Sequence, residues 1–236
     1  MRNPANRMSD GISSARCGAC RLVQRDCLCH MVPRIPTRTR VVLVMHQLED
    51  RKTSNTGRLA HRCLPNSEIV IRGDPERSRH AQETRLAARA GLPPPSLVTP
   101  RLPAPDNAGA APRDWTLHGD PVLLFPHPDA RPLESWRDHP RPLTLIVPDG
   151  TWTQGQRVRH RTPGLASIPC ATIARIAPSN YRLRRTVDPA RLATLEAIAE
   201  ALGVLEGEGP RQALLEIFDV MVERALRART GGTKRP

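Results

Sequence analysis

Four cysteines fall close together near the start of the chain, at Cys17, Cys20, Cys27 and Cys29. Their C-x2-C-x6-C-x-C spacing suits a tetrahedral metal ion, because two thiolates a few residues apart chelate it as a pair. In a reducing compartment such thiols favour zinc over disulfides. The spacing therefore predicts a structural zinc site with no open coordination position. An iron–sulfur cluster and a disulfide pair remain alternatives, and His30 could replace one cysteine.

A second candidate site follows the apolar run at 143–147, where Asp149, Gly150, Thr151 and Trp152 come in succession. Ligands of open α/β sheets bind beyond the carboxyl ends of strands. Glycine permits a tight turn or a close ligand approach, and a helix start exposes free N–H groups. Asp149 or Thr151 could instead only cap a helix, with Trp152 in the core. The position at the end of a strand favours a binding or catalytic role.

The chain is strongly basic, with 36 Lys and Arg against 23 Asp and Glu and a net charge of +13. Such an excess indicates a polyanionic partner. Three Trp, one Tyr and two Phe are too few for a broad base-stacking platform, so we expect a structured nucleic acid held through its phosphates. Seven arginines and no acid lie between Arg157 and Arg185, which predicts a phosphate-binding surface rather than an ordinary solvated face.

The elements that must position these residues alternate between short apolar runs and helical patterns. This alternation predicts an α/β fold with a mostly parallel sheet. No G-x-G-x-x-G follows the first strand and no P-loop motif occurs, so neither nucleotide-binding fold is supported. Strands are expected at 41–45, 68–71, 122–125, 143–147 and 167–173, and helices at about 53–63, 80–90, 152–160, from Asp188 and from Pro210.

The predicted organisation is one catalytic domain with a small appendage. Residues 1–15 are expected to be a disordered tail, 16–36 a zinc-binding segment, 37–228 the α/β domain and 229–236 a basic tail. No run approaches the roughly 20 apolar residues of a membrane span, and the N-terminus lacks the apolar stretch of a secretory signal. A cytoplasmic protein is therefore expected.

Six short motifs occur in an order that resembles the DTW-domain family of tRNA-uridine aminocarboxypropyltransferases, over about residues 16 to 226. They are the cysteine motif, S-N-T-G at Ser54–Gly57, L-L-F-P at Leu123–Pro126, D-G-T-W at Asp149–Trp152, Y-R-L-R at Tyr181–Arg184 and T-L-E-A at Thr194–Ala197. Two departures are visible. The segment 102–113 looks like an insertion, and the first strand ends His-Gln where His-Pro is more usual.

The resemblance implies a SPOUT-type α/β fold, with S-adenosylmethionine held in knotted loops at the carboxyl edge of the sheet. The implied reaction moves the 3-amino-3-carboxypropyl group of S-adenosylmethionine to N3 of a tRNA uridine, in the variable loop, and leaves methylthioadenosine. The implied partner is tRNA, with no DNA and no membrane. A SPOUT-like RNA methyltransferase and a non-catalytic zinc-containing RNA-binding protein are the alternatives.

Roles in this reaction can be assigned to individual residues. Asp149 is the expected proton acceptor, or orients the base edge, and Trp152 is expected to stack on adenine or uracil. Arg184 or Arg182 would hold the cofactor carboxylate, and Glu196 its ammonium group unless it only faces a helix dipole. The expected cofactor-binding residues are Phe125, Pro126, Asp149, Gly150, Thr151, Tyr181, Arg184, Thr194 and Glu196. The expected tRNA contacts are Arg157, Arg159, Arg161, Arg182 and Arg185.

Overall fold

The computed structural model describes residues 15–50, 52–73, 83–93, 113–174, 178–183 and 191–230. Its centre is one six-stranded sheet in the order β2-β1-β5-β3-β6-β4, and every neighbouring pair of strands is parallel. The prediction of an α/β fold with a mostly parallel sheet is confirmed. The strands are β1 (Arg40–His46), β2 (Ser67–Arg72), β3 (Asp120–Leu124), β4 (Arg131–Pro132), β5 (Leu143–Asp149) and β6 (Cys170–Thr172).

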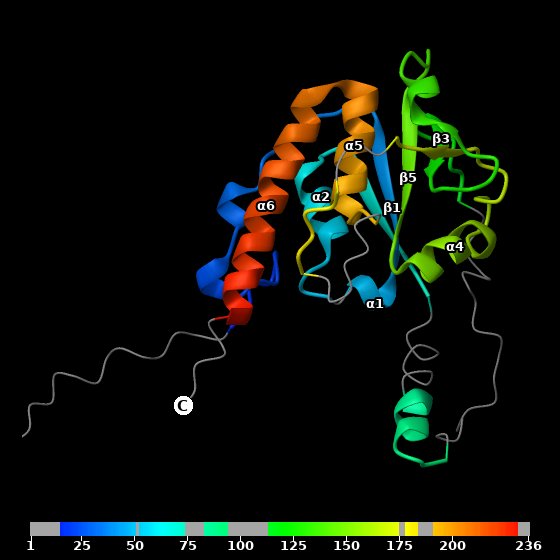
Figure 1. Ribbon diagram of the computed structural model, residues 1–236. Coiled ribbons are helices and arrows are strands. Elements are labelled where there is room, and N and C mark those ends of the chain that lie inside the picture. The colour runs from blue at the N-terminus through cyan, green and yellow to red at the C-terminus, as the bar shows by residue number, and fades with distance from the viewer. Residues whose placement is uncertain are drawn as a thin grey trace, which may run out of the picture.

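Helices cover both faces of this sheet. Figure 1 shows α2, α5 and α6 on one side of the strands and α4 on the other. The α-helices are α1 (Gln47–Asp50), α2 (Thr56–Cys63), α4 (Trp152–Arg161), α5 (Thr194–Glu206) and α6 (Glu208–Thr230). Short 3-10 helices occur at η1 (Gln24–Asp26), η2 (Cys29–Met31) and η3 (Leu133–Trp136), and residues 83–89 are also helical.

The core consists of two apolar layers, one on each face of the sheet. Successive side chains of a strand point to opposite faces. Accordingly Val41 and Leu43 of β1 pack in the layer beneath α2, α5 and α6, whereas Val42 and Val44 pack in the layer on the α4 side. All four are at most 1% exposed, which explains why the run reads as continuously apolar rather than alternating. This buried strand places its carboxyl end beside that of β5.

Several element boundaries differ from the sequence-based expectations. The fourth predicted helix was placed from Asp188, but α5 begins at Thr194, and residues 184–190 lie outside the described part of the chain. The strand expected at 167–173 is shorter in the structure, because β6 covers only Cys170–Thr172. Pro169 lies immediately before β6 and has no N–H to donate to a neighbouring strand. The cap of α2 is Asn55, so this helix begins at Thr56 rather than at about residue 53. Local sequence propensity therefore indicates that a helix is present, but it does not determine the residue at which the helix begins.

The last helix, α6, begins two residues before Pro210 and reaches Thr230, so it extends into the segment expected to be a basic tail. Gly207 separates it from α5 with a φ of +97°, a conformation that glycine adopts without a Cβ clash. Residues 102–112 of the segment expected to be an insertion, and residues 1–14 of the expected tail, lie outside the described residues. In the part of the chain that is described, no helix has both the length and the apolar character to cross a bilayer.

Candidate functional site

The four N-terminal cysteines form one cluster, with all four sulfur atoms within 4.8 Å of one another. The Cys17 and Cys29 sulfurs are 3.6 Å apart, and those of Cys20 and Cys27 are 3.8 Å apart. Zinc–sulfur bonds of about 2.3 Å in a regular tetrahedron place neighbouring sulfurs about 3.8 Å apart. Two sulfur pairs have this spacing and every other pair lies within 4.8 Å, so the cluster is close to the arrangement that a four-sulfur metal site requires.

The electrostatics of this cluster also favour a cation. Backbone N–H groups of Cys20 and Ala19 lower the pKa of Cys17 to about 6, so this thiol ionises readily. Burial raises the pKa of Cys20, which has to lose its proton beside the Cys17 thiolate. Several thiolates at these distances repel one another, and a bound divalent ion removes that repulsion.

Asp149 ends β5 and is only 6% exposed. The Thr194 hydroxyl donates to its Oδ1 at 2.5 Å, and Asn55 Nδ2 donates to its Oδ2 at 2.7 Å. Burial raises the pKa of Asp149, and these two hydrogen bonds offset part of that rise. The carboxylate thus joins three elements, namely the end of β5, the start of α2 and the first residue of α5.

The S-N-T-G segment is shaped around this carboxylate. The Asn55 side chain has two roles, because its Oδ1 also accepts the backbone N–H of Arg58 at 2.7 Å and caps α2. A Cβ on Gly57 would lie 2.8 Å from Asp149 Oδ2 and 2.8 Å from a methyl group of Leu43. Only glycine at this position lets α2 pack this closely against the end of β5.

The D-G-T-W segment turns directly into α4. Thr151 caps this helix, with its hydroxyl accepting the Gln154 N–H at 3.4 Å and Gln154 Oε1 accepting the Thr151 N–H at 2.6 Å. Capping, which the sequence left open between two residues, therefore belongs to Thr151 and leaves Asp149 for another role. A Cβ on Gly150 would approach the Gln154 side chain to 2.9 Å, so the turn is tight. Trp152 opens α4, and its side chain lies outside what is described.

Glu196, in the first turn of α5, is 5% exposed and is surrounded by donors from its own chain. It accepts hydrogen bonds from the Ser179 hydroxyl at 2.6 Å and from the backbone N–H groups of Asn180 at 2.7 Å and Ala193 at 2.6 Å. These three donors occupy most of the acceptor positions of this carboxylate, which leaves little of it for a cofactor ammonium. Its observed contacts fix the loop at 179–181 against α5.

Tyr181 extends the same network toward α2. Its hydroxyl donates to the Ser54 carbonyl at 2.7 Å, and its ring lies 5.8 Å from that of Phe218 in α6. Arg182 is exposed beside it, whereas Arg184 and Arg185 fall outside the described residues. Side-chain hydrogen bonds thus bring four segments together at one end of the sheet, namely 54–57, 149–152, 179–181 and 193–196.

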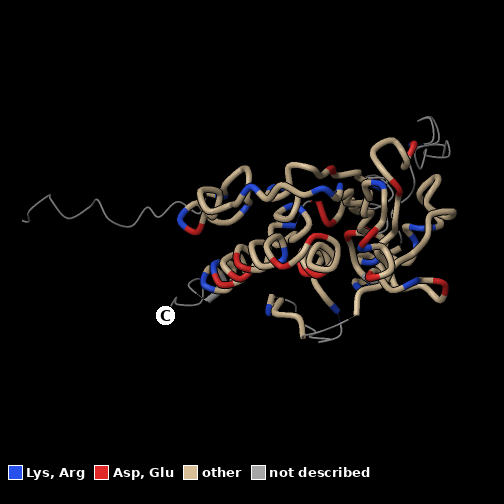
Figure 2. Tube along the Cα trace, turned by 90° about the horizontal axis from the view of Figure 1, so that it is seen from above, with Lys and Arg blue, Asp and Glu red and all other residues tan. Residues whose placement is uncertain are grey.

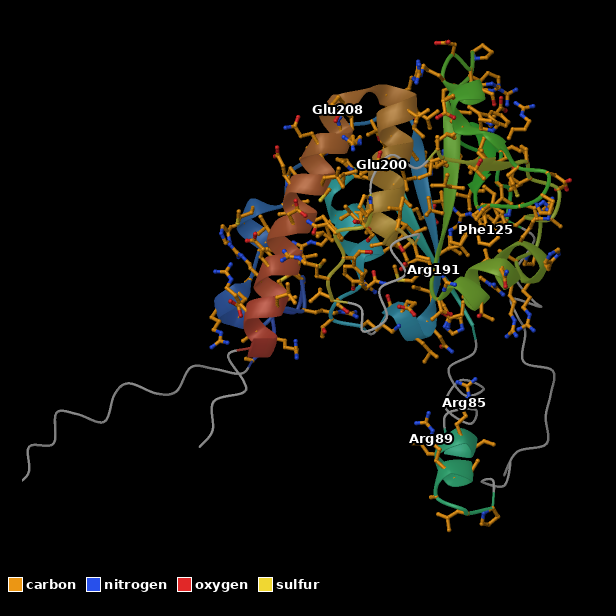
Figure 3. The ribbon with its side chains drawn as sticks, viewed as in Figure 1. Arg85, Arg89, Phe125, Arg191, Glu200 and Glu208 are labelled. Carbon is orange, nitrogen blue, oxygen red and sulfur yellow. The ribbon has the colours of Figure 1, made fainter. Side chains whose placement is uncertain are left out.

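Phe125 and Pro126 stand at the next strand end along this edge. Phe125 follows β3 and lies on the α4 side of the sheet in Figure 3, half-buried against Gly155, where a Cβ would come within 3.2 Å of its ring. Pro126 is exposed. An aromatic face and a proline beside the D-G-T-W turn form the apolar part of the candidate site.

The arginines expected to contact RNA are not equivalent in the structure. Arg157 and Arg161 are exposed on α4. Arg159 instead donates to the Ala166 carbonyl at 3.1 Å and lies 2.7 Å from His127 Nε2, so it is engaged in the fold. Figure 2 shows basic residues on the N-terminal segment and around the sheet, and a mixture of both signs along α6.

A hollow of about 450 Å³ lies at the opposite edge of the sheet, near the amino end of β3. It is lined by residues that include Trp115, Trp136 and Asp120, the last of which lies 2.6 Å from His139 Nε2. None of the motif residues borders it. The candidate site is therefore the carboxyl edge, where the motifs converge, and not this hollow.

Two sets of contacts in the structure were not predicted from the sequence: that of Asn55 with Asp149, and those of two arginines with the cysteine segment. In the sequence Asn55 is marked only by the S-N-T-G motif, and the structure shows that it both caps α2 and contacts Asp149. Arg62 of α2 and Arg224 of α6 were not singled out, yet Arg62 Nη1 donates to Cys29 Sγ at 3.2 Å and Arg224 to backbone carbonyls of the cysteine segment. No local pattern marks such distant contacts.

The protein is of the α/β class, with a parallel sheet whose motif loops are hydrogen-bonded together at the carboxyl edge. It also carries a cluster of four cysteines. The DTW domain family matches residues 14–226, and the chain belongs to that family. No solved structure matches the chain significantly.

Named relatives of this chain are tRNA-uridine aminocarboxypropyltransferases at modest identity. The chain is 25% identical over 196 residues to tRNA-uridine aminocarboxypropyltransferase 2 of Drosophila melanogaster, covering 81% of this chain and 66% of that protein. Against the Macaca fascicularis protein of the same name it is 26% identical, covering 80% of this chain and 56% of the relative. Against tRNA-uridine aminocarboxypropyltransferase A of Arabidopsis thaliana it is 26% identical, covering 87% and 79%. The chain thus spans only about 56–66% of the length of the first two relatives.

Proposed function

We propose that this chain transfers the 3-amino-3-carboxypropyl group of S-adenosylmethionine to N3 of a tRNA uridine in the variable loop. The convergence of four family motifs carries the proposal. Asp149 binds Asn55 and Thr194, and Tyr181 binds the Ser54 carbonyl, so the motifs form one site at the carboxyl edge. Ligands of parallel sheets bind at that edge. The names of the relatives support the same activity.

The residues at this edge fit S-adenosylmethionine as the donor substrate. Adenine needs an apolar wall, which Phe125 and Pro126 offer, with Trp152 stacking on a base. The sulfonium is a cation, and the buried carboxylate of Asp149 is the charge that attracts it. The turn before α4 is formed by Gly150 and Thr151, and the first turn of α5 contains Thr194 and Glu196. The proposed fold of this site is the knotted SPOUT arrangement, with Tyr181 in a binding loop and Arg184 or Arg182 holding the carboxylate.

The proposed reaction is a single displacement. The N3 lone pair of uridine forms a bond to the terminal methylene of the aminocarboxypropyl group, the carbon–sulfur bond breaks, and methylthioadenosine leaves with the electron pair. Asp149 accepts the N3 proton. Each of its oxygens keeps a lone pair beyond the bonds to Thr194 and Asn55, and its raised pKa makes it a stronger acceptor than an ordinary aspartate. The remaining gain comes from positioning the two substrates.

The other proposed components are a structural zinc ion and a tRNA-binding surface. Four sulfur ligands leave zinc no open position, so the ion held by the cysteine cluster would stabilise the N-terminal segment rather than take part in transfer. The exposed Arg157 and Arg161, with Arg182 and Arg185, would contact tRNA phosphates. Because Arg159 is engaged in the fold, its proposed contribution is to hold α4. We propose tRNA rather than DNA as the partner and the cytoplasm as the compartment.

The decisive experiment analyses the products after the chain is incubated with unmodified tRNA and S-adenosylmethionine. The proposal predicts methylthioadenosine in equal amount to a uridine that has gained the aminocarboxypropyl mass, located by nuclease digestion and mass spectrometry. S-adenosylhomocysteine with a methylated nucleotide would instead identify an RNA methyltransferase. Binding of tRNA without either product, under conditions where the chain is folded and binds the donor, would identify a non-catalytic RNA-binding protein.

A further inference from the structure

Arg62 connects the cysteine cluster to the helix that borders the candidate active site. It lies in the last turn of α2, and its Nη1 donates to Cys29 Sγ at 3.2 Å. The guanidinium and the sulfur come from segments that are 33 residues apart in the chain. Arg62 itself belongs to none of the six motifs.

We propose that Arg62 is an outer-shell residue of the metal centre that raises its metal affinity and fixes α2 to it. The inference rests on the proposed metal site. Four thiolates around a divalent ion carry a formal charge of about −2, and a guanidinium N–H directed at one sulfur offsets part of it. The same hydrogen bond holds the Cys29 sulfur in position toward the metal. Outer-shell donors of this kind change metal affinity by about 10–100-fold.

The same contact has a consequence for the active site, because α2 is held at both ends. At its amino end Asn55 caps the helix and binds Asp149. At its carboxyl end Arg62 binds Cys29. Asn55 and Arg62 are seven residues apart, so about 10 Å along the helix axis separates the two attachments. A filled metal site therefore restrains the short helix whose start positions the proposed proton acceptor.

A second contact connects the same two parts of the molecule. Arg58, one turn earlier on α2, pairs with the Asp50 carboxylate. Asp50 also pairs with Arg21 of the cysteine segment at 3.9 Å, and Arg21 donates to the Asp50 carbonyl. The cysteine segment is thus joined to α2 both directly, through a ligand sulfur, and indirectly, through α1. Only the direct contact reaches a metal ligand, which is why Arg62 is the residue to test.

The first test compares the zinc affinity of full-length variants by competition with a chromogenic chelator at neutral pH. Arg62→Met removes the donor and the charge, and we expect its affinity to fall at least about tenfold. Arg62→Lys keeps the charge and should recover part of the loss. Arg25→Met is the matched control, since Arg25 carries the same charge in the cysteine segment but pairs with Asp26 at 3.3 Å and is 46% exposed. We expect it to remain within about threefold of wild type.

Cobalt substitution supplies a readout that a loss of packing would not move. Hydrogen bonds to a thiolate lower the energy of its lone pairs, so the sulfur-to-cobalt charge-transfer band should shift to longer wavelength in Arg62→Met and stay in place in Arg25→Met. Hydrogen exchange then tests the link to the active site. Amides at 56–63 should exchange faster in zinc-loaded Arg62→Met than in zinc-loaded wild type.

The outcomes separate this inference from the proposals on which it depends. A wild-type chain that takes up no zinc refutes the metal centre and this inference with it. Equal zinc affinity and unchanged cobalt spectra for wild type and Arg62→Met refute the role of Arg62 and leave the metal centre and the transferase intact. Equal losses in Arg62→Met and Arg25→Met would overturn it too, because they would reduce the effect to general charge.

Discussion

Replacement of Asp149 by Asn isolates the negative charge of the proposed proton acceptor while it preserves the geometry. An asparagine can place its amide oxygen where Oδ2 accepts from Asn55, and its NH2 where Oδ1 lies, because the Thr194 hydroxyl can rotate from donor to acceptor. Two charge-assisted hydrogen bonds then become neutral ones, at a cost of about 1 kcal/mol each. Relief of the buried charge offsets this cost. The expected change in stability is within about 1 kcal/mol.

The effect on chemistry should be much larger than the effect on folding. An amide oxygen still accepts a hydrogen bond from uridine N3–H but cannot take the proton, and loss of a general base typically costs about 10²–10⁴-fold in rate. The assay is a single-turnover measurement with labelled S-adenosylmethionine and tRNA, set beside melting curves. Thr194→Ser is the control, because it keeps the hydroxyl donor and should retain a near-wild-type rate. A rate for Asp149→Asn within tenfold of wild type would refute the proton-acceptor role.

The same variant makes a pH prediction whose sign follows from burial. Burial raises the pKa of Asp149 above its ordinary value of 3.8 in the folded chain. The folded state then keeps this proton to higher pH than the unfolded state, so the contribution of Asp149 to stability falls as pH rises from about 3.8 through the folded pKa. Asn lacks this proton. The stability of wild type relative to Asp149→Asn, measured by urea unfolding, should decrease over that range; a difference that rises with pH contradicts the predicted direction.

Three further changes test the remaining parts of the site. Gly57→Ala should destabilise the chain by about 1–3 kcal/mol in thermal melts, because its Cβ would lie 2.8 Å from the Asp149 carboxylate; an unchanged melting temperature would mean that α2 can shift. Arg157→Ala with Arg161→Ala should reduce the slope of log tRNA affinity against log salt by about 1–2, whereas Arg141→Ala at the amino edge should leave it unchanged; a constant slope in the double variant would place the RNA surface elsewhere. Cys27→Ser should lower the metal content and the melting temperature more than the transfer rate per folded molecule, and full zinc occupancy by elemental analysis would exclude Cys27 as a ligand.

Much of the architecture could be predicted from the sequence because its signals are local. The apolar runs at 41–45 and 143–147 became β1 and β5, since a strand buried on both faces must be apolar at consecutive positions. The cysteine cluster was also predictable, because chelation depends on residues that are close in the chain. The helix break at Gly91, where φ is +68°, has the same local origin.

The contacts that assemble the site are non-local, and only the tertiary structure determined them. Asn55 and Asp149 are 94 residues apart in the chain, and Thr194 is 45 residues beyond Asp149. Their hydrogen bonds exist because parallel strands bring their carboxyl ends to one edge, so loops that are distant in sequence share one small volume. Sequence alone indicated that Asp149 ends a strand. Its burial and its two donors, and hence the direction of its pKa, depend on how α2 and α5 pack against that strand.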